Sequence, residues 1–199
     1  DVYKRQQIVY GSHNTMTYLP IKNWWLFPGL LIVRCQNHSI REQFLYGARV
    51  FDLRIYFNTK SMQWEFAHGL INFKSKESVT EIIRCLKQLK ETTQDDIYVR
   101  LILEKWTSEW ECHDFSCKCK FYERACPNLK FIGGNRKGDW KKLYTFKTDI
   151  PDSLNNQWVS SMAEDAKWYE KAFPFLYARR MNKKNRLKMR EKLNLFDFV

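Results

Sequence analysis

The sequence predicts an α/β fold in which a parallel sheet curls into a (β/α) barrel of the TIM type, trimmed or irregular in its second half. Segments with the composition of strands alternate with helical patterns along the first half of the chain, which is typical of parallel sheets. The chain has 199 residues, whereas a complete barrel of this type needs about 250. The expected barrel is therefore a shortened one.

Strands are expected where β-branched, apolar and aromatic residues gather between turn residues. The first half of the chain holds such segments at 7–10, 49–57, 62–68 and 97–104. The second half is less regular, with short candidates at 129–132 and 143–146 and a final strand at 193–199. The first strand ends at Gly11, which places His13 just past its C-terminal end.

Helices are expected between these strands. Ser39 and Glu42 have the spacing of a capping box, in which each side chain can bond the backbone N–H of the other residue. The helix that they open runs to Tyr46 and stops at Gly47, a residue suited to a left-handed C-cap. Further helices are expected at 78–90, where apolar residues recur with helical period, within 153–171, and at 179–192, which is strongly basic.

Residues 7–199 are expected to form a single domain, because no repeat or linker interrupts them. Residues 1–6 resemble the translated end of a sequencing adapter, so we expect them to be an artefact or disordered and the true N-terminus to be missing. A net charge of +12 favours anionic partners such as nucleic acid, lipid head groups or phosphorylated substrates. No apolar run reaches the ~18 residues of a membrane span.

Six cysteines are present. Four of them crowd into one stretch: Cys112, Cys117, Cys119 and Cys126. Their spacing lacks the paired C-x₂-C knuckles that indicate zinc. We rank disulfides in a secreted protein first, a structural metal second and free thiols third. Cys35 and Cys85 lie in apolar segments and are expected to be small core residues.

The strand at 49–57 carries two charged side chains in apolar surroundings. Because successive side chains alternate between faces, Asp52 and Arg54 share one face. The opposite face is apolar and carries Phe51, Leu53 and Ile55. Burying charges is costly unless they are paired or solvated. The pattern predicts either a structural ion pair or a strand end that opens into a site, and the flanking motifs favour the site.

Polar residues recur late in the expected strands or just beyond them. They are His13, Asp52, Arg54, His68, Glu104 and Asp197. In (β/α) barrels the chemistry lies at the C-terminal ends of the strands, so we expect these residues to line one site. Two histidines and an arginine suit phosphodiester cleavage: one imidazole removes a proton, an imidazolium donates one, and the guanidinium stabilises phosphoryl charge. For either histidine alone, a structural role is the alternative.

Three motifs follow one another within 8–69: Gly-Ser-His-Asn-Thr at 11–15, Gly-Ala-Arg-Val-Phe-Asp-Leu-Arg at 47–54, and His-Gly at 68–69. Together they resemble the catalytic X region of phosphatidylinositol-specific phospholipases C, most closely the metal-independent bacterial type. The resemblance implies a phosphodiesterase that cleaves phosphatidylinositol, or a glycosylated relative, into a cyclic inositol phosphate and diacylglycerol. Weaker similarity continues to the end of the chain.

The resemblance also implies a role for each polar residue. His13 is the base that activates the inositol 2-hydroxyl, His68 is the acid, and Arg54 binds the phosphate. Asp52 matches the carboxylate that assists the acid, and Asp197 matches a late carboxylate that orients the base, as in a catalytic triad. Since the first and last strands of a closed barrel are neighbours, Asp197 is expected within reach of His13. A solvent-exposed C-terminal Asp is the alternative.

Some positions depart from the bacterial pattern. Asn14 stands where the bacterial type usually has Asp, and the calcium-dependent relatives have Asn there. Those relatives place an acid where this chain has Arg54. Glu104 falls at a calcium-ligand position, and we expect it to pair with Arg54 or contact substrate. One carboxylate and one amide beside a guanidinium make a poor Ca²⁺ site. We therefore expect no metal and no cofactor, with Asn14, Arg54 and Glu104 binding substrate.

Trp24 and Trp25 follow the first strand on the expected rim of the site, where exposed aromatic rings can enter a membrane interface. Packing against a helix is the alternative. The expected partner is phospholipid at an anionic membrane surface, with no nucleic acid and no stable protein partner. We expect a monomer that is secreted or peripheral at a membrane surface.

Two other functions stay open. One is a metal-dependent phosphodiesterase of the glycerophosphodiester or sphingomyelinase D type on the same barrel, which needs an acid where Arg54 stands. The other is a catalytically inactive phospholipid-binding module. Both histidines and Arg54 argue against that module, whereas Asn14 keeps it open.

Overall fold

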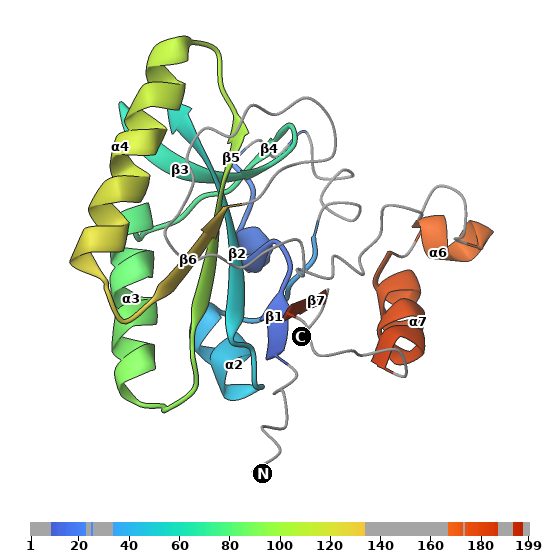
Figure 1. Cartoon of the computed structure of the whole chain (residues 1–199). Helices are drawn as coiled ribbons and strands as arrows, with labels where there is room; N and C mark the ends of the chain where they lie inside the picture. Colours follow the sequence, from blue (N-terminus) through green and yellow to red (C-terminus); the bar gives the residue numbers. More distant parts are fainter. Residues whose placement is uncertain are drawn as a thin grey trace.

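The computed structural model describes residues 9–22, 25, 34–133, 167–172, 174–186 and 193–196. They form a mixed α/β structure built around one sheet (Figure 1). The strands are β1 (Val9–Ser12), β2 (Val50–Asn58), β3 (Gln63–His68), β4 (Ile71–Asn72), β5 (Tyr98–Lys105), β6 (Lys130–Gly133) and β7 (Leu193–Phe196). The helices are the 3₁₀ helix η1 (Thr15–Tyr18) and the α-helices α2 (Ile40–Leu45), α3 (Val79–Glu91), α4 (Glu109–Ala125), α6 (Trp168–Ala172) and α7 (Pro174–Arg186).

The sheet has a parallel body to which an antiparallel hairpin is attached. The parallel strands follow the order β7-β1-β2-β5-β6. β3 pairs antiparallel with the C-terminal half of β2, and β4 pairs antiparallel with β3. β2 has nine residues, so β1 can pair at Val50 and Phe51 while β3 pairs farther along, from Ile55. The predicted neighbourhood of first and last strands is confirmed, because β1 pairs with β7.

The predicted closed barrel is not confirmed. Among the described strands, β6 and β7 do not pair with each other, so the sheet stays open. The sheet also departs from a (β/α) barrel in its hairpin, in which β3 runs back along β2 after the turn at 59–62. A parallel neighbour needs a crossover of a dozen or more residues, and this turn is far shorter. The predicted strand at 143–146 and most of the predicted helix at 153–171 lie outside the described residues.

The helix-capping signals in the sequence are confirmed. In α2, the Ser39 hydroxyl accepts from the backbone N–H of Glu42, and the Glu42 carboxylate accepts from the backbone N–H of Ser39 at 2.8 Å. The chain then turns at Gly47, whose φ of +98° is a conformation that favours glycine. The same reciprocal cap opens α3 at Ser78 and Glu81.

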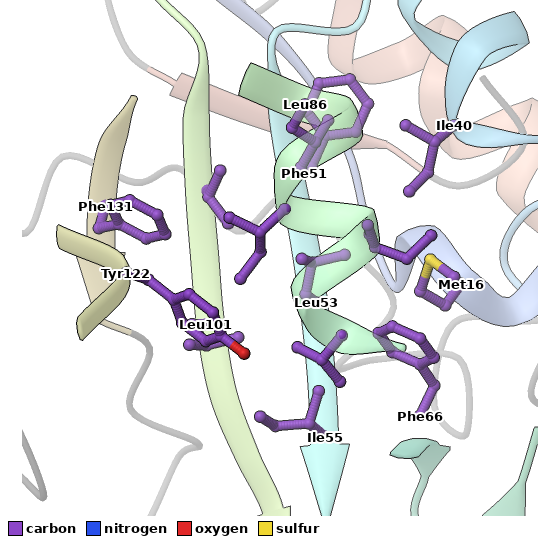
Figure 2. Close-up of a cluster of buried hydrophobic side chains, with 14 of the residues drawn as sticks. Met16, Ile40, Phe51, Leu53, Ile55, Phe66, Leu86, Leu101, Tyr122 and Phe131 are labelled. Atoms are coloured by element: carbon purple, nitrogen blue, oxygen red, sulfur yellow. The ribbon is translucent and has the colours of Figure 1, made fainter. Parts of the chain in front are cut away.

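The apolar face of β2 packs against the helices on one side of the sheet. Phe51, Leu53 and Ile55 are fully buried, and Figure 2 shows them among side chains from the neighbouring strands and α3. α3 contributes its apolar stripe: Val79, Ile82, Ile83, Leu86 and Leu89. α4 lies alongside α3 (Figure 1), and the hydroxyls of Tyr122 and Thr80 are hydrogen-bonded at 2.9 Å. The opposite face of β2 is left for polar residues.

The cysteine-rich stretch forms α4, a helix that the sequence analysis did not predict. Its N-cap is Ser108, whose hydroxyl accepts from the backbone N–H of Glu111 at 3.4 Å. All six cysteines are described and all are free thiols, so the predicted disulfides do not form. The helix buries Cys119 and leaves Cys117 in solvent, and burial raises the pKa of the Cys119 thiol. Over the described ranges, no cluster of three or more His, Cys, Asp or Glu side chains suits a metal.

The C-terminal part contains α6, α7 and β7. Residues 179–186 of the predicted basic helix lie in α7, which begins earlier, at Pro174, a residue favoured in the first turn of a helix. The rest of that prediction, 187–192, lies outside the described residues. α6 and α7 are joined by Glu170, which accepts from Nε of Arg180 at 2.6 Å and from Nη2 at 2.7 Å. Within the part of the chain that the structure describes, no helix is long and apolar enough to span a membrane.

Candidate active site

His13 directly follows β1 and is buried, with 2% of its surface exposed. Its carbonyl oxygen accepts a hydrogen bond from Nε2 of Gln36 at 3.0 Å. The next residue, Asn14, has φ 45° and ψ 54°, a left-handed conformation that Asn adopts more readily than most residues. This turn places the Asn14 amide beside the imidazole, with 3.2 Å between Nδ2 and Nε2 of His13.

Buried hydroxyl and amide groups fix the turn after β1. The Thr15 hydroxyl donates to the carbonyl of Ser12 at 3.1 Å and accepts from the backbone N–H of Asp52 at 2.9 Å, so it ties the turn to β2. From α2, the Gln43 amide donates to the carbonyl of Thr15 at 3.0 Å and accepts from the Ser12 hydroxyl. Buried polar groups that are paired in this way hold a single arrangement, which keeps His13 in place.

Asp52 lies on the polar face of β2 and is 1% exposed. Its Oδ2 accepts from Nε of Arg54 at 3.2 Å and from the backbone N–H of Asn14 at 3.1 Å, and it lies 3.9 Å from Nε2 of His13. Its Oδ1 lies 3.5 Å from Nη1 of Arg100. Burial opposes ionisation, but Arg54 and Arg100 outweigh it and hold the pKa of Asp52 well below its usual range.

The guanidinium of Arg54 connects the two carboxylates to a histidine. Besides its bond to Asp52, Nη1 lies 3.5 Å from Oε2 of Glu104 and Nη2 lies 2.8 Å from Nε2 of His13. Burial opposes the charged form, but Asp52 and Glu104 raise the pKa of Arg54 above its usual value. A guanidinium can only donate hydrogen bonds. Nε2 of His13 therefore accepts, which places the proton of the neutral imidazole on Nδ1.

His68 meets His13 across the Asn14 amide. Nδ2 of Asn14 lies 3.3 Å from both ring nitrogens of His68, and the two imidazole centroids are 6.4 Å apart with their planes at 82°. His68 is half-buried, whereas His13 is almost fully buried. The two rings thus face one space from different elements and with different access to solvent.

The turn after β3 is tied to Arg54 through Glu104. The backbone N–H of Gly69 donates to Oε1 of Glu104 at 2.7 Å, while Oε2 of the same carboxylate faces Arg54. Gly69 has a φ of +57°, which is rare for residues with a Cβ. The predicted pairing of Glu104 with Arg54 is confirmed.

The alternation of side chains along β3 does not by itself put His68 in the site. Trp64 and Phe66 share its parity and are buried in the hydrophobic core. His68 is the last residue of β3, and the turn at Gly69 follows at once. The imidazole reaches the Asn14 amide from this strand end.

The structure brings together most of the site residues that the sequence predicts: His13, Asn14, Asp52, Arg54, His68 and Glu104. Asp52 differs in its contacts, because they go to the His13 side of the site and to the two arginines, not to His68. The predicted site residue Asp197 and the predicted membrane contact Trp24 lie outside the described residues. Trp25 is 63% exposed, so helix packing is wrong as an explanation for this residue.

Sequence reasoning missed Arg100 and the amides of Gln36 and Gln43. Arg100 lies on the same face of its strand as Glu104, and this alternation was the one sequence feature that could have indicated a place in the site. The amides support the turn after β1 from distant segments, and no local pattern reveals such contacts. The sequence had also assigned Cys35 only to the core, whereas its Sγ lies 3.6 Å from Nδ2 of Asn14.

The charges of the buried centre balance in pairs. Asp52 and Glu104 supply two carboxylates, and Arg54 and Arg100 supply two guanidinium groups. Arg54 stands between the carboxylates and bonds to both. A cation held by these carboxylates would meet Arg54 at close range, so the donor set does not fit a divalent metal. The arrangement suits an anion drawn to Arg54, flanked by one neutral imidazole and a second that is half-buried.

Comparisons with family models and with curated proteins found no match. Among solved structures, the phosphatidylinositol-specific phospholipase C of Listeria monocytogenes matches with a TM-score of 0.60 and 15% identity, over 97% of this chain and 88% of that one. The Staphylococcus aureus phospholipase C of the same specificity matches with a TM-score of 0.58 and 14% identity, over 97% and 86% of the two chains. A second structure of the S. aureus protein gives a TM-score of 0.59 and 12% identity, over 98% and 86%.

These likenesses extend over nearly the whole chain, whereas the sequence motifs are dense only within 8–69. At such low identity they establish the fold and leave the activity to the geometry of the site. The resemblance inferred from the three motifs is confirmed by the fold. The chain has the fold of the bacterial phosphatidylinositol-specific phospholipases C.

Proposed function

We propose that this protein cleaves the phosphodiester of phosphatidylinositol, or of a glycosylated relative, into a cyclic inositol phosphate and diacylglycerol. The observation that carries the proposal is the meeting of His13, His68 and Arg54 around the Asn14 amide, with Nη2 of Arg54 2.8 Å from Nε2 of His13. An acceptor imidazole, a second imidazole and an anion-binding fork are the groups that intramolecular phosphodiester cleavage needs. The fold shared with the bacterial phospholipases C supports the same reaction class.

In this mechanism His13 is the general base. Its Nε2 carries a lone pair, which Arg54 engages before substrate binds. A substrate phosphoryl oxygen is a stronger acceptor for the guanidinium than a neutral imidazole is. Arg54 therefore turns toward the phosphate, and Nε2 of His13 is released to accept the proton of the inositol 2-hydroxyl.

His68 is the general acid. As the 2-oxygen forms its bond to phosphorus, the bond from phosphorus to the diacylglycerol oxygen breaks, and His68 donates a proton to that leaving oxygen. One proton enters at His13 and one leaves at His68, so the step balances without a co-reactant. The half-buried position of His68 gives the imidazole access to solvent protons between turnovers.

Arg54 takes the place of a divalent metal in this proposal. It is held between two carboxylates and carries a permanent charge with paired donors. Before substrate binds, Glu104 and Asp52 hold it beside His13, and Glu104 also ties it to the turn that follows His68. Asn14 adds no negative charge between the imidazoles, so phosphate approaches a centre whose carboxylates are already paired.

The proposed substrate is a lipid, so the protein would work at a membrane surface, and we propose that it does so as a monomer that is peripheral or secreted. The net charge of +12 favours an anionic surface. Trp25 is an exposed aromatic residue in the connection after η1, and such a ring is suited to the membrane interface. Asp197 is proposed to orient His13 from beyond β7, which pairs with β1.

A substrate panel tests the proposal. Vesicles of phosphatidylinositol, phosphatidylcholine and sphingomyelin, and soluble glycerophosphocholine, are each incubated with the protein and with His13→Ala. We expect turnover of phosphatidylinositol alone, absent in the variant. Turnover of sphingomyelin or glycerophosphocholine would point to the metal-dependent alternative. Binding of vesicles without turnover of any of them would point to an inactive lipid-binding module.

A further inference from the structure

Arg100 is a buried charged residue to which the mechanism above gives no role. It lies on β5 with Asp52 as its register partner on β2, and 3% of its surface is exposed. On its other side, its register partner on β6 is the apolar Ile132, and Ile102 follows on the same face of β5. On the β6 side of the sheet, an apolar residue would therefore suit position 100.

The burial of Arg100 is costly. Its one described ion pair joins Nη1 to Oδ1 of Asp52 at 3.5 Å. Within the described part of the chain, its Nε is buried without a hydrogen-bond partner, and such a group costs free energy. Burial, and then the like charge of Arg54, lower the pKa of Arg100. The surroundings of Arg100 other than Asp52 therefore do not account for an arginine here, which directs attention to what the guanidinium does for Asp52.

The two oxygens of Asp52 have separate partners. Oδ1 faces Arg100, whereas Oδ2 accepts from Arg54 and from the backbone N–H of Asn14. A guanidinium at Oδ1 fixes the rotation of the carboxylate, so that Oδ2 stays aimed at Arg54. It also leaves Asp52 a partner when Arg54 turns toward a phosphate. Without Arg100, the release of Arg54 would leave a buried carboxylate short of positive charge, which is strongly unfavourable.

We propose that Arg100 is a positioning residue, which holds Asp52 in the orientation that aims Arg54 and compensates Asp52 when Arg54 is drawn to the substrate phosphate. This inference rests on the proposed phosphodiester cleavage. It assigns Arg100 no contact with substrate.

The first measurement is steady-state cleavage of phosphatidylinositol vesicles by Arg100→Met and Arg100→Lys. We expect kcat of Arg100→Met to fall about 10- to 100-fold, as when a catalytic group is misplaced by about 1 Å, while KM changes little. Arg100→Lys keeps the charge and is expected to recover part of kcat, and it stands in for the Met variant if that one fails to fold. A rise in KM with unchanged kcat would overturn the proposal, because it would indicate direct substrate binding.

A double-mutant cycle with Asp52→Asn identifies the route of the effect. If Arg100 acts through Asp52, adding Arg100→Met to Asp52→Asn has no further effect on kcat. Full additivity in folded variants overturns the proposal. The matched control is Arg49→Met at the residue just before β2. It removes an arginine whose Nε lies 2.9 Å from Oδ2 of Asp95. We expect this control to lose stability and keep kcat.

A second readout does not depend on activity. The Nε–H signal of Arg54 in ¹⁵N NMR spectra is assigned by its loss in Arg54→Lys. Because this buried group donates to Asp52, we expect slow solvent exchange in the wild type and faster exchange with a shifted signal in Arg100→Met. An unchanged signal in folded Arg100→Met overturns the role of Arg100. If the wild type does not cleave phosphatidylinositol, the proposed function fails, and this signal still decides whether Arg100 positions Arg54.

Discussion

The two faces of β2 are equally buried and are stabilised by opposite means. On one face, Phe51, Leu53 and Ile55 are fully buried and pack against neighbouring strands and α3 (Figure 2). On the other, Asp52 and Arg54 are 1% and 6% exposed and are held by charge pairs. On the first face, each apolar side chain that is removed from water stabilises the fold, by about 1.5–3 kcal/mol for a large side chain. The burial of the charged face contributes little net stability, and removing any one partner would leave a buried charge unpaired.

This difference explains how one strand can serve both the fold and a site. Apolar packing has no direction, so the core face tolerates small shifts as long as its volume stays filled. The charged face is directional: Arg54 reaches Asp52, Glu104 and His13 with three different nitrogens. A change on the core face should therefore alter stability alone, whereas a change on the charged face should also alter chemistry.

The largest effect is expected at the histidines. His13→Ala and His68→Ala should each lower turnover of phosphatidylinositol by about 10²–10⁴, the usual contribution of a general acid or base. Both variants should retain the circular dichroism spectrum of the wild type, because the apolar core is untouched. Substantial activity in either folded variant would remove that histidine from the mechanism.

Arg54→Lys should be impaired by about 10²–10³ in kcat, comparable to the loss of one oxyanion donor. One ammonium cannot reproduce three nitrogens that bond Asp52, Glu104 and His13 at the same time. The control is Arg84→Lys on the exposed surface of α3, which should behave as wild type. A fully active Arg54→Lys would show that the fork geometry is not needed.

Leu53→Ala and Asp52→Asn distinguish the two faces, because both should lower stability and only Asp52→Asn should lower kcat. Leu53→Ala should cost about 2–5 kcal/mol of unfolding free energy and leave the kcat of the remaining folded protein nearly unchanged. Asp52→Asn breaks a buried charge pair and should cost about 3–5 kcal/mol, with a large loss of kcat. Urea unfolding of both variants, alongside steady-state kinetics, gives these values.

The same two variants should differ in their dependence on pH. The pKa of Asp52 is lowered in the folded state, so its contribution is present at neutral pH, above the unfolded pKa. It declines as the pH falls below about 4 and disappears only below the folded pKa. The difference in unfolding free energy between wild type and Asp52→Asn should therefore become smaller from pH 5 to pH 2. The corresponding difference between wild type and Leu53→Ala should stay constant. A constant gap for both would mean that Asp52 is not held by charge.

Much of the fold follows from local patterns. The alternation along 49–57 assigned each face of β2 correctly, since it depends on the strand period alone. The capping box placed α2, because a cap is a contact within four residues, and the helical period of the apolar residues placed α3. α4 was missed because its cysteines suggested cross-links, although Ser108 and Glu111 carry a capping pattern. The open sheet was missed because it depends on whether β6 and β7, which lie far apart in the sequence, pair with each other.

Site residues at the ends of strands could be predicted from the sequence. Site residues whose role depends on contacts with distant segments could not. His13, Arg54 and Glu104 were placed from strand ends and motif order. The alternation of side chains along β3 puts His68 on the same face as core residues. Only the position of His68 at the end of the strand brings its imidazole to the Asn14 amide. The role of Arg100 required the register of β2 against β5, which no sequence pattern contains.

The smallest effect is expected at the membrane. Trp25→Ala should weaken binding to phosphatidylinositol vesicles by about 5- to 30-fold, since the indole is 63% exposed and its transfer is worth roughly 1–2 kcal/mol. Cleavage of a soluble short-chain substrate should be unchanged. The matched control is Trp168→Ala on α6, an indole that is 83% exposed. Equal loss of vesicle binding in both variants would remove any special role of Trp25.

The most direct test follows the phosphorus atom by ³¹P NMR, with phosphatidylinositol vesicles and an excess of calcium chelator. We expect the diester signal to be replaced by that of a five-membered cyclic inositol phosphate, at the same rate with and without the chelator. This is the result expected when the inositol 2-hydroxyl attacks phosphorus and the Arg54 guanidinium takes the place of a metal. Loss of the reaction in the chelator, restored by added Ca²⁺, or a first product that is never cyclic, would contradict the proposed mechanism.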